Sequence, residues 1–229
     1  MIINEHSFIV KGTVNGQSFI YDDWMPRPRT VSDEAILEAT FRVISRFGPA
    51  DLTLAHVAKE VGLSPATLLQ RFGSKRGLLL ALAKSSAESV EGCFAALRAE
   101  HKSPLEALIA GALTMARMTT SPEELSNGLA FLQMDLSDPE FHRLALENSA
   151  RIQNGYHILI EEAIKANELI PCDARKLARA VSAVSSGSII EWAIHRKGTA
   201  AAWVEADLKT LVDRYRWSPL KGRAKKPRR

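Results

Sequence analysis

The pattern of apolar and polar residues changes at about residue 31. From there to residue 217, apolar side chains recur every three or four positions, which is the spacing of an amphipathic helix. Ser or Asp followed by Pro recurs where new helices should begin, because these residues suit a helix cap and first turn. We therefore expect an all-α fold of about nine helices, near residues 33–47, 53–60, 64–70, 75–98, 103–119, from 121, 137–167, 173–196 and 199–215.

The chain before residue 31 has a different pattern. Two apolar runs flank Asn15-Gly16, and Asn-Gly between such runs favours a β-hairpin. Met25 could equally well be the first residue of the protein, so we expect residues 1–24 to be dispensable. The expected organisation is an N-terminal extension with a hairpin (1–30), a small helical domain (31–76), a larger helical domain (77–217) and a disordered basic tail (218–229).

Residues 53–72 have the spacing of a helix-turn-helix. Ala58 precedes Gly62 by four residues, so a small side chain lets two short helices approach while glycine supplies the positive φ of a tight turn. Any helical hairpin with a glycine turn would share this spacing. The preceding full helix and the Gly73-Ser74-Lys75 start of another favour a DNA-binding unit. The outward face of its second helix should then carry Pro65, Ala66, Thr67, Gln70 and Arg71.

Charge is distributed unevenly along the chain, whose formal net charge is +4. Residues 25–76 carry eight basic and five acidic side chains, whereas residues 77–217 carry fifteen basic and eighteen acidic ones. A basic segment before a slightly acidic body indicates that the first part meets a polyanion. Arg27 and Arg29 would form an arm on DNA or a solvated linker, and the tail would be a phosphate-binding arm or simply solvated.

The segment from Thr53 to Leu79 resembles the DNA-binding signature of the tetracycline-repressor (TetR) family. The matching features are the Thr before an apolar-Ala pair, the Gly-Leu-Ser turn, the Thr-Leu before Phe72, and the Ser-Lys before a leucine-rich helix. The resemblance covers about 50 residues, from 31 to 83. It implies an N-terminal three-helix helix-turn-helix domain that binds double-stranded DNA, and a C-terminal helical domain for ligand binding and dimerisation.

The resemblance also implies roles for single residues. Thr53 and Lys75 would hold phosphates, while the outward residues 65–67, 70 and 71 would lie in or beside the major groove. One departure concerns Leu69, where the family usually has a tyrosine that contacts phosphate and base. Leu69 cannot donate a hydrogen bond, whereas Arg71 could reach a phosphate or a guanine edge. The candidate DNA-binding residues are therefore Thr53, Pro65, Ala66, Thr67, Leu69, Gln70, Arg71 and Lys75.

The larger domain has features of a sensor. Methionine and aromatic residues at helical spacing could line an apolar pocket, with Gln133, Asn154 and His157 as polar anchors, although such residues are more often plain core. The candidate ligand residues are Phe94, Met115, Met118, Phe131, Gln133, Met134, Tyr156 and Trp192. Small residues at 178, 182, 186 and 187 and an apolar stripe on the last helix favour a homodimer interface, or packing within one subunit.

These features together predict a transcriptional regulator. It is expected to be a repressor that a small, largely apolar effector releases from a palindromic operator; a ligand-independent or architectural DNA-binding protein is the alternative. A helical enzyme is less favoured, because six scattered histidines form no catalytic motif. Cys93 and Cys172 have no metal-ligand spacing, so we expect no metal or cofactor. No apolar run reaches 18 residues, and no signal peptide is evident, so a cytoplasmic protein without a membrane partner is expected.

Overall fold

The computed structural model describes residues 9–14, 17–22 and 31–218. Two strands, β1 (Ile9–Val14) and β2 (Gln17–Asp22), pair antiparallel, with Ile9 opposite Asp22 and Val14 opposite Gln17. They belong to a unit separate from the helices that follow. The Asn15-Gly16 turn, both arginines of the expected arm, and the tail from residue 219 onward lie outside the described residues.

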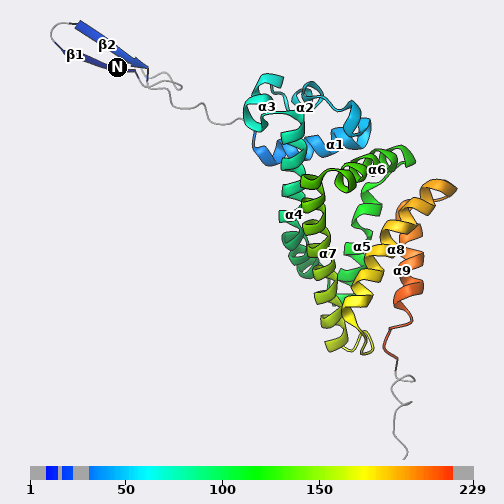
Figure 1. Ribbon diagram of the computed structural model, residues 1–229. Helices are drawn as coiled ribbons and strands as arrows, with labels where there is room; N and C mark the ends of the chain where they lie inside the picture. Colours follow the sequence, from blue (N-terminus) through cyan, green and yellow to red (C-terminus); the bar gives the residue numbers. More distant parts are fainter. Residues whose placement is uncertain (1–8, 15–16, 23–30, 219–229) are drawn as a thin grey trace, which may run out of the picture. The chain divides into compact units, whose positions relative to one another are not determined.

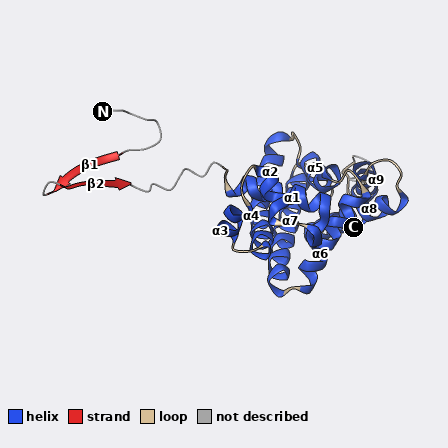
Figure 2. Ribbon diagram, turned by 90° about the horizontal axis from the view of Figure 1, so that it is seen from above, coloured by secondary structure: helices blue, strands red, loops and turns tan. Residues whose placement is uncertain are grey.

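The described chain from residue 31 onward is helical, which confirms the predicted all-α fold (Figure 2). Its helices form one compact unit. They are α1 (Asp33–Asp51), α2 (Leu54–Val61), α3 (Pro65–Phe72), α4 (Lys75–Glu100), α5 (Pro104–Met118), α6 (Pro122–Ser137), α7 (Pro139–Lys165), α8 (Ala174–His195) and α9 (Ala200–Val212). We call residues 33–76 the head and residues 77–217 the body. No helix of the described part is long and apolar enough to cross a membrane.

Three body helices begin at the cap-proline pairs that the sequence indicates. Ser103, Ser121 and Asp138 each accept a backbone N–H of the following turn through a side-chain oxygen. The proline that follows each cap lacks an N–H that would have no partner there anyway. These starts are therefore determined by local chemistry and do not depend on what the helices pack against.

The end of α1 is more complex than the sequence indicates. Gly48 has a φ of 72°, which ends the regular helix where the break was predicted. The chain then makes one further turn through Pro49 to Asp51, so the helical segment extends past the break. Pro49 is tolerated because the glycine has already interrupted the hydrogen-bond ladder.

Long helices pack side by side in the body (Figure 1). Helix α7 lies against α4, α5 and α8, and α8 lies against α9. One apolar cluster joins them, with Leu108, Ile160, Val181 and Val204 almost fully buried. After α9 the chain returns to the α7–α8 loop, where the Ile170 N–H donates to the Tyr215 carbonyl at 2.7 Å. The C-terminal helices are therefore fixed to the core of the body.

Candidate nucleic-acid interface

A tight glycine turn joins α2 and α3 as the sequence predicts. Gly62 has a φ of 68°, and the N–H of Leu63 donates to the carbonyl of Ala58 at 2.9 Å. A Cβ at Gly62 would meet nothing within 4 Å, so backbone conformation and not space requires glycine here. Ala58, Val57 and Leu68 are buried, and α2 and α3 pack against each other. The crossing of the two helices is therefore set by the turn and by small, well-packed side chains.

The first turn of α3 is held by two hydroxyl groups. The Ser64 Oγ accepts the N–H of Thr67 at 3.1 Å, and it shares a second hydrogen bond with the Thr67 Oγ1 at 2.9 Å. Pro65, Ala66, Leu69 and Gln70 are exposed, while Thr67 and Arg71 are partly buried. Leu69 is 51% exposed. The outward face of α3 is thus preformed and only weakly polar.

Two other helix starts lie next to α3 in sequence and carry the expected phosphate-contacting residues. Thr53 caps α2 by accepting the His56 N–H at 3.2 Å, which leaves its own hydroxyl proton available. Ser74 caps α4 by accepting the Gly77 N–H at 2.9 Å. The Lys75 ammonium donates to the carbonyl of Ala50 at 2.8 Å and keeps two further donors. Both starts expose N–H groups and a positive helix-dipole end, which favour an anion.

A pair of arginines that the sequence analysis did not single out braces the head. Arg42 Nε and Arg46 Nη2 of α1 contact the same Glu60 oxygen, at 3.2 and 2.7 Å. Their hydrogen bonds, that of Arg42 first, lower the pKa of the Glu60 carboxyl. The contact holds α2 on α1. Both arginines of α1 are therefore engaged within the head, although sequence alone would count them as available to DNA.

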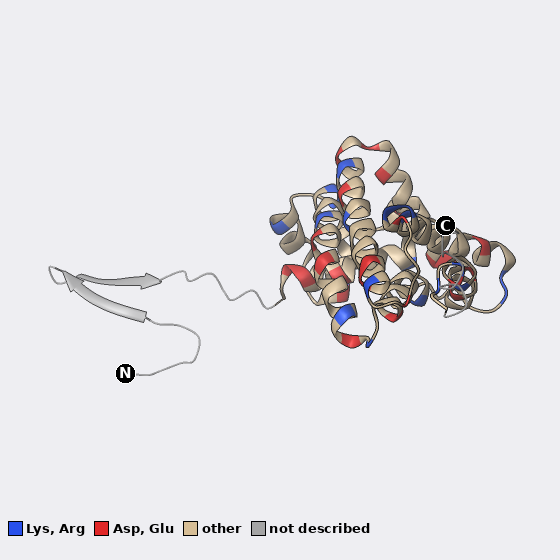
Figure 3. Cartoon of the chain, turned by 90° about the horizontal axis from the view of Figure 1, so that it is seen from below, with Lys and Arg blue, Asp and Glu red and all other residues tan. Residues whose placement is uncertain are grey.

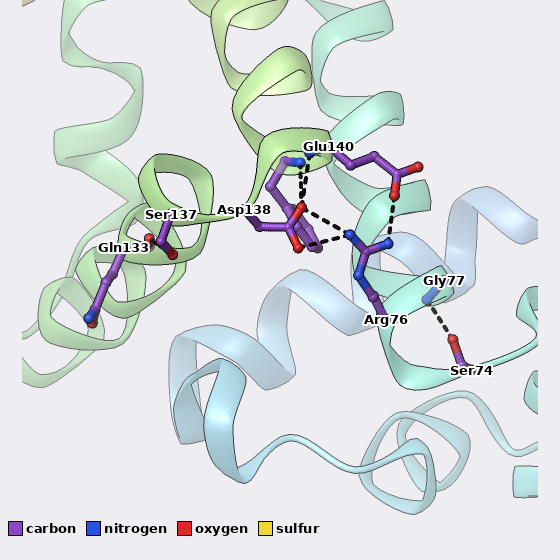
Figure 4. A network of polar contacts seen from close by, with 8 residues as sticks. Ser74, Arg76, Gly77, Gln133, Ser137, Asp138 and Glu140 are labelled. Carbon is purple, nitrogen blue, oxygen red and sulfur yellow. Dashed lines mark hydrogen bonds and ion pairs between the residues drawn. The ribbon is translucent and has the colours of Figure 1, made fainter.

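Arg76 is likewise engaged within the protein. Its guanidinium lies between Asp138 and Glu140 at the start of α7, as Figure 4 shows. Hydrogen bonding to Arg76 is the main cause that lowers the pKa of the Asp138 carboxyl. No single-sequence signal could have paired these residues, because 62 residues separate Arg76 from Asp138.

Acidic and basic residues are interspersed over the helices rather than gathered into one large patch (Figure 3). Many of them pair along or between neighbouring helices, such as Arg98 with Glu162 at 3.1 Å. The charge pattern alone therefore does not mark the DNA-binding face. The exposed start of α3 is a better candidate for such a face.

The eight candidate ligand residues fall into separate groups. Phe94 and Tyr156 are buried and meet edge to face, with ring centroids 5.3 Å apart. Burial raises the pKa of Tyr156 to about 12. Trp192 is buried near α9 and donates from Nε1 to the Gly198 carbonyl at 3.1 Å. Phe131 is half-buried and lies edge-on to Phe141 of α7.

The other candidates lie nearer to solvent. Met115 and Met118 of α5 are more than half exposed, Gln133 of α6 is exposed, and Met134 is half-buried. A cavity of about 310 Å³ lies between α4 and α7, and its walls include Phe94, Asn154 and Ile158. Phe94 is the one member of the eight that lines this cavity, and Asn154 is the one proposed anchor that does so. The ligand-site assignment stays a prediction.

Polar groups edge this cavity. Arg98 pairs with Glu162, and Arg151 pairs with Glu147 at 2.8 Å and with Glu91 at 3.2 Å. Elsewhere on α7, the Nδ1 of His157 is buried without a hydrogen-bond partner. In the part of the chain that the structure describes, no three His, Cys, Asp or Glu side chains gather as metal ligands.

Two family models match the chain over most of its helical part. The model "Bacterial regulatory proteins, tetR family" matches residues 36–82, and "BetI-type transcriptional repressor, C-terminal" matches residues 105–216. Together they cover more than half of the sequence. The chain belongs to the TetR family. This TetR-family protein is a DNA-binding transcriptional regulator and not an enzyme, as the sequence predicted. The match to the body was not apparent from sequence inspection alone.

Relatives and solved structures agree with this assignment. The HTH-type transcriptional regulator BetI of Stenotrophomonas maltophilia is 29% identical over 163 residues, which are 69% of this chain and 79% of the relative. A transcriptional regulator from Saccharomonospora viridis in complex with choline has a TM-score of 0.65 at 21% identity, covering 81% of this chain and 97% of that one. FadR from Bacillus subtilis in complex with stearoyl-CoA has a TM-score of 0.55 at 19% identity, covering 77% and 96%. These likenesses support the fold that the helices show.

Proposed function

We propose that this regulator is a repressor that binds a pseudo-palindromic operator as a homodimer, in the cytoplasm, and leaves it when a small, largely apolar ligand binds the body. The observation that carries the proposal is the preformed, exposed start of α3. Pro65, Ala66 and Gln70 have no packing role there, and Ser64 holds the first turn in place. A helix presented in this way fits the major groove of DNA by its N-terminal residues.

The residues around α3 divide into two roles in this proposal. Thr53 and Lys75 hold phosphates on either side of the groove, because each stands at a helix start with donors to spare. Gln70 and Arg71 supply polar contacts to base edges. Leu69, with Ala66, supplies an apolar surface suited to a thymine methyl group.

The proposed dimer would form through the exposed face of α8. Ile190 and Ile194 lie on the exposed face of α8, at 39% and 67% exposed, whereas the opposite face of this helix is buried in the core. Ser186 is exposed and Gly187 is half-buried on the same helix, so a second backbone could approach closely. Leu208 and Val212 of α9, in contrast, pack within the subunit. A two-fold dimer would present two copies of α3 to the two halves of a palindrome.

The proposed ligand is small because the α4–α7 cavity, at about 310 Å³, lies at the lower end of the range for small-molecule pockets. Choline is the first probe to use, since a structure with this fold carries it in its title and the C-terminal match is to the BetI type. Choline carries a permanent positive charge, but its quaternary nitrogen has no N–H donor and is surrounded by methyl and methylene groups. Stearoyl-CoA, the ligand named for another similar structure, is the matching large probe.

The proposal is tested by in vitro selection of DNA with the purified protein. We expect enrichment of one palindromic sequence, and a protein–DNA complex that contains two subunits by mass. Addition of choline, or of a small, largely apolar compound, should then dissociate the complex. Failure to enrich any palindrome would overturn the operator and dimer. Enrichment followed by indifference to every small compound would identify a ligand-independent DNA-binding protein.

A further inference from the structure

Arg76 makes a three-point ionic contact between the head and the body. Its Nη1 donates to a Glu140 oxygen at 2.6 Å, and its Nη2 donates to both Asp138 oxygens at 2.9 Å. The guanidinium carbon also lies 5.5 Å from the ring centroid of Phe141. We call Arg76, Asp138, Glu140 and Phe141 the clasp, and Figure 4 labels the first three of them.

The body side of the clasp is fixed before Arg76 reaches it. Asp138 ends α6, because its N–H donates to the Met134 carbonyl at 3.0 Å. It also starts α7, because its Oδ1 accepts the N–H groups of Glu140 and Phe141 at 2.9 and 3.3 Å. Phe141 is buried and lies edge-on to Phe131 of α6. The position of the Asp138 carboxylate is therefore fixed by the junction between α6 and α7.

The head side of the clasp is coupled to α3 through the backbone. Arg76 lies in the first turn of α4, which Ser74 caps. A Cβ on the next residue, Gly77, would clash with the carbonyl of Phe72 at the end of α3. Close-packed backbones transmit displacement rather than absorb it. A shift of Arg76 therefore moves the end of α3 as well.

A second contact between head and body is neutral and lies on α1. The Asn127 amide of α6 donates to the Ser45 carbonyl at 2.9 Å, beside the kink at Gly48. Helix α4 runs without a break from the head into the body and packs on α7. The clasp adds a charged contact at the first turn of this helix, and the Asn127 contact adds a neutral one on α1.

We propose that Arg76 is a positioning residue whose clasp fixes the angle of the head on the body and thereby the half-site spacing that the dimer accepts. The inference rests on the proposed function, because spacing has meaning only for a dimer on a two-part operator. Two carboxylates offset the charge of this guanidinium, so it adds little attraction for phosphate. A simple surface pair contributes little to stability, but a forked, preorganised arginine contact adds geometric specificity.

The test compares spacing preference in matched variants. Arg76→Ala and Arg76→Lys remove or weaken the fork, and Asp138→Asn removes the charge while keeping a good helix cap. The control variants Lys84→Ala and Glu88→Gln remove one positive and one negative charge further along α4. These two side chains pair within that helix at 3.8 Å. Binding is measured on the selected operator and on versions with one base pair added to or removed from the spacer. Unfolding curves show that each variant is folded.

We expect wild type and the control variants to prefer the native spacing by about tenfold or more, or about 1.4 kcal/mol. The clasp variants should keep about a third or less of that ratio. The double variant Arg76→Ala with Asp138→Asn should lose no more than either single one. Asp138→Asn is decisive. Removal of an acidic charge by itself strengthens binding to any DNA, whereas the clasp predicts weaker binding at the native spacing.

Hydrogen exchange provides a second measurement that needs no DNA. Amides at residues 72–79 should exchange faster in Asp138→Asn than in wild type or Glu88→Gln. Unchanged exchange and an unchanged spacing ratio would each overturn the clasp while leaving the operator proposal intact. A wild type without any spacing preference would overturn the dimeric operator instead, and the exchange experiment would still decide whether the clasp holds the head.

Discussion

The head and the body hold their helices in place by different means. Helices α2 and α3 have eight residues each, too few to be stable alone, and they bury Val57, Ala58 and Leu68. The caps at Thr53 and Ser64 and the turn at Gly62 fix where these two helices begin and how they are joined. Helices α4, α7 and α8 have 22 to 27 residues and share one continuous core. Local chemistry thus shapes the part that contacts DNA, whereas long-range packing shapes the part proposed to contact a ligand.

The largest effect should come from the few buried residues of the head. Leu68→Ala should lower the free energy of unfolding by about 2–5 kcal/mol, because Leu68 is fully buried and the cavity left behind cannot be filled by neighbours. DNA binding should be lost with it. The adjacent Leu69→Ala is the control, since Leu69 is half exposed and its loss should leave stability within about 0.5 kcal/mol. Equal destabilisation in urea titrations would contradict the assignment of inner and outer faces.

A similar test of the body concerns Gly155. A Cβ at this position would overlap the Phe94 ring, so Gly155→Ala should cost about 1–3 kcal/mol of unfolding free energy. Gly128→Ala on α6 is the matched control, because its Cβ would meet nothing within 4 Å and alanine favours a helix. Thermal unfolding should separate the two variants. Equal melting temperatures would mean that α4 and α7 are less tightly packed than the structure shows.

Arg71 and Lys75 separate base recognition from phosphate binding within the head. Arg71→Ala should weaken binding to the selected operator by about 1–3 kcal/mol if its guanidinium contacts a base edge. Lys75→Ala should weaken binding to all sequences and reduce the salt-dependence slope by about 1. Titrations of specific and unrelated DNA at several salt concentrations measure both. If Arg71→Ala weakens binding equally to specific and unrelated DNA, Arg71 contacts phosphate and not a base edge.

The smallest effect is a pH dependence of the body. Burial raises the pKa of Asp135 on α6 from 3.8 to about 6. The folded state therefore binds the proton more tightly, so this contribution to stability is full below pH 4 and is lost as pH rises through 6. With a discount for partial exposure, the loss should be about 1–2 kcal/mol. Asp135→Asn should remove it, while Asp51→Asn, at an exposed site, should not; parallel curves for wild type and Asp135→Asn would contradict the burial.

Sequence inspection worked best where the determinants are local. The starts at Ser103, Ser121 and Asp138 and the turn at Gly62 each depend on a few adjacent residues, so their chemistry could be predicted. The exposed face of α3 followed from helical periodicity. The break at Gly48 was found, but the extra turn after it was not, because a residue in a left-handed conformation can end one helix and lead into another.

What could not be predicted depends on contacts between distant segments. Nothing in the sequence pairs Arg76 with Asp138, or distinguishes buried Tyr156 from exposed Met115, since both are apolar residues at helical spacing. Periodicity identifies that a helix has an apolar face but not which neighbour covers it. The family model over residues 105–216 supplied the likeness of the body that inspection missed.

The exposed start of α3 also bears on how such a regulator can change during evolution. Pro65, Ala66, Leu69 and Gln70 contribute nothing to the core, whereas Leu68 between them is fully buried. Selection for a stable protein and selection for a particular DNA target therefore act on different positions of the same short helix. A duplicated gene could acquire a new target through a few substitutions on this face without passing through an unfolded ancestor.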